Sequence, residues 1–118
     1  MFPSFLLAKL YVKGSLKNTD TGFEFALKNI IDSTQLIGIG PICVGEKNYE
    51  GQAITMTVAD KTVNGAELSR QNSIPVRMGL PLKVSVAGDR LVPGAQRIAV
   101  AATTSDIGKI KFEISDNV

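Results

Sequence analysis

The sequence predicts an all-β fold, an antiparallel β-sandwich of about seven or eight strands that is immunoglobulin-like or jelly-roll-like. Apolar and polar side chains alternate with a period of two along most of the chain, and turn sequences recur about every 8 to 12 residues. Helical character is confined to Ala66–Arg70, about one turn. Because 118 residues with 44% hydrophobic content suffice for one core, we expect a single domain over residues 1–118.

The clearest strands lie in the last quarter of the chain. The turn sequence Leu91–Gly94 precedes one alternating strand, and Ile107-Gly108 precedes a return strand. Each strand has one apolar face, formed by Ile98, Val100 and Ala102 in the first and by Ile110, Phe112 and Ile114 in the second. The opposite face of the return strand carries Lys109, Lys111 and Glu113. We interpret these lysines as a solvated face that guards against edge pairing.

Earlier segments follow the same alternation. Leu10–Lys13 and Phe23–Lys28 flank the turn-prone stretch Asn18–Gly22 and predict a hairpin. The apolar run Leu36–Val44 contains two glycines and Pro41, which predicts a bulged or kinked strand rather than a regular one. Two further strands are predicted over residues 52–59 and 82–87.

Composition excludes most catalytic chemistry. The chain has no histidine, which removes the commonest general base and the commonest zinc ligand. Cys43 is the one cysteine, and we expect it to be a buried free thiol. Gly38–Gly40 resembles the start of a dinucleotide-binding loop, but Pro41 follows and no helix comes next. We therefore predict no catalytic residues, no metal site and no cofactor.

Charge and hydropathy narrow the range of partners. Thirteen basic and eleven acidic residues give a net charge of +2 without a basic stripe, so a nucleic-acid partner is not expected. The first ten residues, MFPSFLLAKL, lack the basic start of a signal peptide, and no stretch approaches the roughly 20 apolar residues of a membrane span. We expect a cytoplasmic protein without a membrane partner.

Interaction residues are the remaining functional candidates. Arg77 and Met78 lie in a short segment between two prolines, and arginine and methionine are enriched at interfaces. Tyr11 and Tyr49 are the plausible exposed rings for ligand or sugar contact. The alternate residues Ala99, Ala101 and Thr103 predict a small, barely polar strand face on which another sheet or subunit can pack.

The order of motifs resembles the small β-subunit family of C-glycoside deglycosidases. The similar segments are GSLKN followed by GFEFALKN, then ITMTVADKTVNGAEL, an arginine-containing segment before a glycine, and LKVSVAGDRLVPGAQRIAV, within roughly residues 14 to 100. The resemblance implies a β-sandwich that partners a larger barrel-type subunit, and this larger subunit would carry the divalent metal and the catalytic residues.

Three functional hypotheses remain open. The chain is a non-catalytic accessory subunit, by resemblance a partner of a metal-dependent barrel enzyme acting on carbohydrates or C-glycosides. Alternatively, it is a stand-alone binding module, or a structural protein that associates with itself through strand edges or an apolar face. We expect a homo- or hetero-oligomer and no catalysis by the chain alone.

Overall fold

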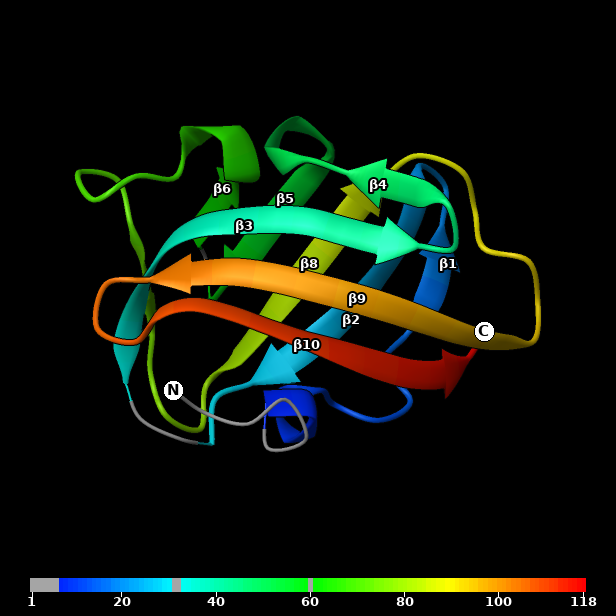
Figure 1. Ribbon diagram of the computed structural model, residues 1–118, viewed down its shortest axis with the longest axis horizontal. Helices are drawn as coiled ribbons and strands as arrows, with labels where there is room; N and C mark the ends of the chain where they lie inside the picture. Colours follow the sequence, from blue (N-terminus) through cyan, green and yellow to red (C-terminus); the bar gives the residue numbers. More distant parts are fainter. Residues whose placement is uncertain (1–6, 31–32, 60) are drawn as a thin grey trace.

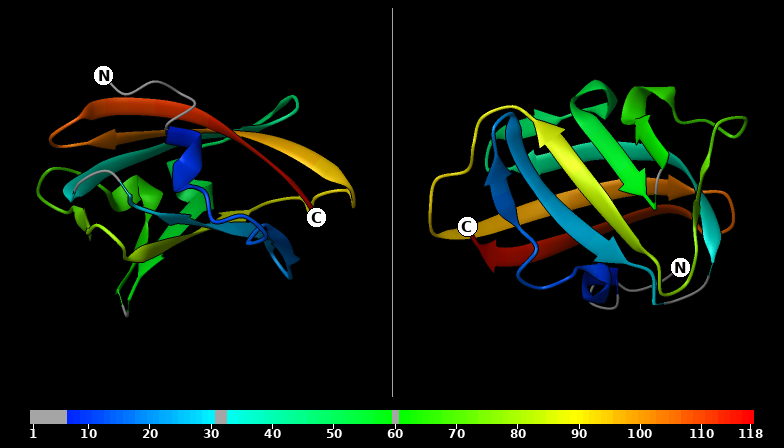
Figure 2. Two further views of the ribbon diagram at one scale, coloured as in Figure 1. Left: turned by 90° about the horizontal axis from the view of Figure 1, so that it is seen from below. Right: turned by 180° about the vertical axis from the view of Figure 1, so that it is seen from behind.

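The computed structural model confirms the β-sandwich. It describes residues 7–30, 33–59 and 61–118, and this part of the chain contains ten strands rather than the seven or eight predicted. They form two antiparallel sheets of five strands each, which lie face to face with their strands running obliquely across one another (Figures 1 and 2). Residues 1–6, part of the stretch that we judged not to be a signal peptide, lie outside the described residues.

Sheet A has the order β1-β2-β8-β5-β6. It begins with a hairpin in which β1 and β2 pair around the turn at Asp20-Thr21. The second strand of this hairpin is the one predicted, but its first strand is Lys17–Thr19 rather than Leu10–Lys13. β8 is the central strand and pairs with β2 on one side and β5 on the other. The bounds of these strands are β1 Lys17–Thr19, β2 Gly22–Lys28, β5 Ile54–Val58, β6 Lys61–Asn64 and β8 Pro81–Ala87.

Sheet B has the order β10-β9-β3-β4, with β7 pairing to the other end of β3. The predicted closing hairpin is β9 and β10, which pair along their whole length from Gly108 opposite Thr104 to Asn117 opposite Ala95. β3 is bulged as predicted, with two shifts of register against β9. The bounds are β3 Thr34–Val44, β4 Lys47–Tyr49, β7 Ile74–Val76, β9 Ala95–Thr104 and β10 Gly108–Asn117.

The core lies between the sheets, because alternate side chains of most strands point inward; in the bulged β3 the buried residues Leu36, Ile39 and Ile42 are three apart. The inward residues of β9 and β10 are those predicted from the alternation, and Ile98, Val100 and Phe112 are buried. Sheet A contributes Phe23, Phe25, Met56, Val84 and Val86 from the other side. Burial of this apolar surface, at about 25 cal/mol per Å², is the main stabilising term of the fold.

Two local predictions are wrong. Leu10–Lys13 is not a strand: Ala8–Leu10 is a turn of 3-10 helix, η1, followed by an isolated bridge from Tyr11 to Leu27. The alternation in this stretch arises because η1 covers the side of the sandwich, where Leu10 packs against the core. Cys43 is half-buried rather than buried, because it points to the outer face of sheet B. The predicted helical turn is a short 3-10 segment, η3, at Gly65–Glu67. Another short 3-10 segment, η2, spans Gly51–Ala53.

Candidate functional site

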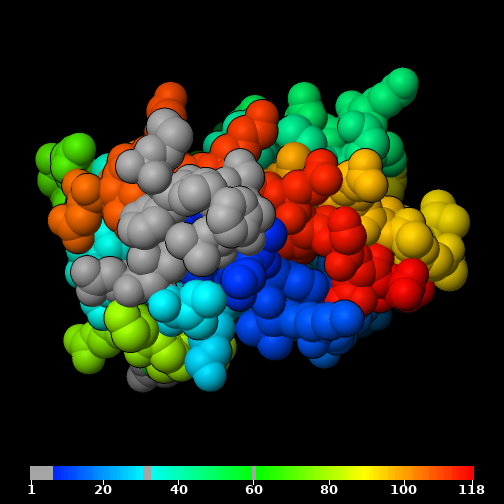
Figure 3. Space-filling model, turned by 60° about the horizontal axis from the view of Figure 1, so that its bottom comes forward, coloured from blue at the N-terminus to red at the C-terminus, as the bar shows by residue number. Residues whose placement is uncertain are grey.

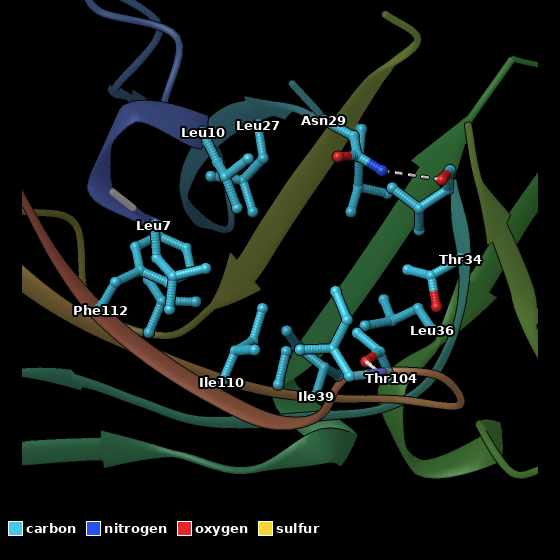
Figure 4. A pocket seen from close by; sticks show the side chains of 15 residues that line it. Leu7, Leu10, Leu27, Asn29, Thr34, Leu36, Ile39, Thr104, Ile110 and Phe112 are labelled. Carbon is cyan, nitrogen blue, oxygen red and sulfur yellow. Dashed lines mark hydrogen bonds between the residues drawn. The ribbon is translucent and has the colours of Figure 1, made fainter. Parts of the chain in front are cut away.

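The space between the sheets is not completely filled. A cavity of about 70 Å³ lies near η1, lined on one side by Leu7, Leu10 and Leu27 and on the other by residues of sheet B that include Ala102 and Phe112 (Figure 4). Asn29 is a buried polar residue at its border. Its side-chain Nδ2 donates to the Val76 carbonyl at 3.0 Å, and its backbone carbonyl accepts from the amide of Gly79. This volume exceeds the roughly 30 Å³ of a water molecule but is half that of a cavity that binds benzene.

We assign this cavity to packing, and a stability measurement tests the assignment. Ala102→Val should raise the free energy of unfolding by about 1 kcal/mol, because the added methyl groups occupy empty space. Ala101→Val is the matched control, since it has the same gain in strand propensity but points outward. Equal shifts of the two midpoints in urea denaturation would contradict the assignment.

The outer face of sheet B is built from small side chains. The register places Gly38 of β3 opposite Thr103 of β9, and Cys43 of β3 opposite Ala99. We call the following set the small-residue face: Gly38, Gly40, Pro41, Cys43, Ala99, Ala101 and Thr103. A hollow of about 560 Å³ runs over most of these residues. Small side chains keep this face low, so a second element can approach the backbone of β3 and β9 closely.

Charged side chains of β10 border the small-residue face. Lys109 lies opposite Thr103 and Lys111 lies opposite Ala101, and both lysines line the hollow. Glu113 follows on the same face and forms an ion pair with Arg97, whose Nε lies 3.3 Å from Glu113 Oε1. The face is therefore weakly polar in its middle and charged along one border, which is the anatomy of an interaction surface with a polar rim.

The Arg77-Met78 segment lies at one end of the sandwich. It forms a turn after β7 in which the Leu80 amide donates to the Arg77 carbonyl, and the Met78 amide donates to Ser33 Oγ at 3.0 Å. The side chain of Met78 is 55% exposed, and Ile30 on the neighbouring segment is 49% exposed. The sequence pointed to Met78 but gave no signal for Ile30, because its exposure depends on the tertiary path of the chain.

The ring of Tyr49 packs against other residues of the sandwich instead of pointing freely into solvent. Its ring meets Phe23 edge to face, with centroids 5.7 Å apart, and it covers Gly88 so closely that a Cβ there would lie 2.5 Å from a ring carbon. Tyr49 is thus half-buried against the neighbouring sheet. The structure brings Arg77 and Met78 together, as their adjacency requires, but it places Tyr49 and Tyr11 in packed surroundings elsewhere.

Tyr11 fastens the N-terminal part of the chain to the end of β10. Its hydroxyl donates to Asp116 Oδ2 at 2.7 Å and accepts from the Leu16 amide, while the Gly14 amide donates to the same carboxylate oxygen. Burial and the bond to Asp116 raise the pKa of Tyr11. The hydrogen bonds from Tyr11 and from backbone amides lower the pKa of Asp116.

These shifts predict how the contribution of Asp116 depends on pH. A carboxyl whose folded pKa lies below its ordinary 3.8 stabilises the fold at higher pH, and this contribution is lost as the pH falls through the lowered pKa. Asp116→Asn should therefore lower the melting temperature at pH 7 and have little effect in strong acid. Melting curves across this range provide the measurement, and a difference that persists unchanged in acid would contradict the linkage.

Several ionisable side chains of the described residues form ion pairs and hydrogen bonds at the surface of the sandwich. No group of three or more histidine, cysteine, aspartate or glutamate residues lies close enough there to hold a metal ion. Three ion pairs are found in this part of the chain, each between exposed or half-exposed strand and turn residues: Lys17 with Glu24, Lys47 with Asp89, and Arg97 with Glu113.

The two packed sheets define the chain as a β-sandwich domain, and comparison with known protein families identifies the family to which it belongs. The family model for the hydroxymethylglutaryl-CoA reductase N-terminal domain matches residues 6–118. The chain belongs to this family. No curated protein matches it. Within the described residues, no helix is long and apolar enough to cross a membrane.

The resemblance to C-glycoside deglycosidase β-subunits is therefore wrong. The family match covers almost the whole chain and names a different family. The segments that carried the resemblance are glycine turns joined to alternating strands, and any antiparallel sandwich with hairpins of similar length needs both. Their order reflects the shared architecture of such folds, so the carbohydrate-enzyme partner that depended on them no longer has support.

Proposed function

We propose that the chain is a non-catalytic accessory domain of hydroxymethylglutaryl-CoA reductase that binds the catalytic part of the enzyme through the small-residue face. The observation that carries this proposal is the family match over residues 6–118, because its description places such domains at the N-terminal side of a reductase. The absence of histidine from the whole sequence supports an accessory role.

The small-residue face is the best-suited docking surface among the described residues. It lies on the two central strands of sheet B, which are held rigidly by long ladders on both sides of β9. Its hollow admits side chains of a partner without rearrangement of the sandwich. The border formed by Lys109, Lys111 and Glu113 supplies charged groups that can set the orientation of the partner.

The outer face of sheet A is a poorer candidate because it carries larger polar and charged side chains. Lys83 and Ser85 point outward from its central strand, β8, and Glu24 lies beside them on β2. Covering these groups would remove water from a lysine and a carboxylate, which costs free energy unless each finds a partner. Thr103, Ala101 and Ala99 impose no such cost.

A matched pair of variants tests the proposal. Ala101→Arg places a long charged side chain in the middle of the small-residue face, and Ser85→Arg makes a comparable change on the central strand of sheet A. Isothermal titration of the full chain into the purified catalytic part of hydroxymethylglutaryl-CoA reductase from the same source should give a complex with the unmodified chain. Ala101→Arg should weaken it at least about tenfold, and Ser85→Arg should leave it unchanged.

Two outcomes would count against this proposal. If the unmodified chain forms no complex with the reductase, the accessory role is wrong. If both variants bind as the unmodified chain does, the docking surface lies elsewhere and the assignment to the small-residue face is wrong. Melting curves of both variants establish that any loss of binding is not a loss of folding.

A further inference from the structure

We propose that the segment of the reductase that covers the small-residue face is acidic, with carboxylates that pair with Lys109 and Lys111 along one border of the hollow. This inference rests on the proposed function and deepens it, because it states the chemistry of the partner at that same surface. Three observations carry it: both lysines line the hollow, neither forms an ion pair within the described chain, and no described carboxylate lines the hollow.

Both lysines stand on the same side of sheet B as the small residues. In the ladder between β9 and β10 they lie opposite Thr103 and Ala101, and directly paired residues of neighbouring strands point to the same face. Residues two apart along a strand are separated by about 7 Å, so the two ammonium groups start from neighbouring points on one border. Both lysines are exposed, and in Figure 3 side chains from the first half of β10, in orange-red, project outward from the surface.

The positive charge of this border is not balanced by the described part of the chain. Neither Lys109 nor Lys111 belongs to its three ion pairs. Glu113, the next outward residue of β10, is already paired with Arg97. The other described residues that line the hollow are all uncharged. The border therefore presents two neighbouring cations whose counter-charges must come from outside the sandwich.

Docking on this face favours a partner that supplies carboxylates. A lysine that loses water in an interface without gaining a partner destabilises the complex. A long side chain at the border can instead turn toward a carboxylate of the partner while its ammonium group keeps part of its hydration. The small side chains in the middle of the face leave room for large apolar residues. We therefore expect a segment with apolar side chains over the alanines of β9 and aspartate or glutamate beside the two lysines.

The same face of a second copy does not provide this chemistry. A symmetric contact through the small-residue face would bring the same residues of two chains together, so four lysines would border one interface. The outward carboxylate of β10, Glu113, is paired with Arg97 of its own chain. A different protein surface with free carboxylates is thus the better occupant.

Salt dependence tests the charge pairing. In isothermal titration of the full chain into the purified catalytic part of the reductase, the affinity should fall at least about fivefold between about 0.1 and about 1 M NaCl, because the screening length shrinks from about 10 to about 3 Å. The double variant Lys109→Glu/Lys111→Glu should bind at least about tenfold more weakly at the lower salt concentration. Its affinity should rise with salt, since salt then screens a repulsion. The matched control Lys28→Glu/Lys83→Glu changes the outer face of sheet A by the same charge and should bind as the unmodified chain does.

A zero-length cross-linker identifies the paired groups directly. A carbodiimide activates a carboxylate, and a lysine amine in contact with it displaces the activating group to form an amide. In the complex this reaction should join Lys109 or Lys111 to an aspartate or glutamate of the reductase, and mass spectrometry detects the joined peptides. Lys83 should give no such product. The cross-link is measured on the unmodified chain, so it does not depend on the folding of any variant.

The outcomes separate this inference from the proposed function. A complex whose affinity responds neither to salt nor to the double variant, and which gives no cross-link at either lysine, overturns the acidic partner while the accessory role stands. Failure of the unmodified chain to bind the catalytic part of the reductase at any salt concentration overturns both. A falling affinity with salt, a reversed salt dependence in the double variant and a cross-link at Lys109 or Lys111 together support the inference.

Discussion

Gly22→Ala should destabilise the protein by about 3 kcal/mol or more, which is a large part of the 5–15 kcal/mol that holds a typical domain together. Gly22 begins β2 and lies between β1 and β8, directly opposite Ala87. A Cβ added there would lie 2.0 Å from the carbonyl oxygen of Val86 and 3.0 Å from the amide nitrogen of Gly88. Both are backbone atoms, one in β8 and one in the residue that follows it, so relief requires the sheet itself to move.

Gly14→Ala is the matched control for this prediction. Gly14 also has a positive φ, of +86°, but no atom lies within 4 Å of a Cβ built on it. Its replacement should cost only the backbone strain of about 1 kcal/mol. Urea denaturation of the two variants separates steric exclusion from backbone strain. Equal losses of stability would show that the approach of Val86 to Gly22 is not as close as described.

Phe23→Ala should cost about 3–5 kcal/mol, the usual range for truncating a fully buried aromatic ring. Phe23 is 0% exposed, and it joins the two layers, because it belongs to β2 of sheet A and its ring meets Tyr49 of β4 in sheet B. Alanine would leave a cavity between the sheets and remove the edge-to-face contact, which is itself worth about 0.5–1.5 kcal/mol.

Two comparisons bound this second prediction. Phe23→Leu keeps most of the volume and should cost less than half as much. Val92→Ala removes methyl groups from a side chain that is 75% exposed, and we expect a change within about 0.5 kcal/mol. The free energy of unfolding from urea titration is the measurement. A loss below about 1 kcal/mol for Phe23→Ala would mean that the contact between the sheets at this end is loose.

The closing hairpin shows why much of the fold follows from local pattern. A half-buried strand must alternate, so the inward residues of β10 are visible as Ile110, Phe112 and Ile114 without any knowledge of their partners. The bulges of β3 were predictable for a related reason, since glycine and Pro41 interrupt a regular ladder. The short strands β4, β6 and β7 were not, because three or four residues are too few to display a period.

Surroundings that depend on distant parts of the chain were predicted less well. Tyr11 and Tyr49 were predicted to be exposed rings. In the structure Tyr11 packs against Phe25 and bonds to Asp116, and Tyr49 packs against Phe23 and Gly88. The pairing of β3 with β9 assembles the small-residue face from segments about 60 residues apart in the sequence. The alternation of β9 predicted that its alanines share a face, but nothing local to β3 indicated that its glycines and Cys43 lie beside them.

Hydrogen–deuterium exchange of the full chain, alone and mixed with the catalytic part of hydroxymethylglutaryl-CoA reductase from the same source, tests the central claim most directly. Docking through the small-residue face should slow exchange in peptides covering residues 38–43 and 99–103 while those of β5 and β8 in sheet A exchange at the same rate as before. Exchange that the reductase leaves unchanged everywhere, or slows in sheet A alone, would contradict the account.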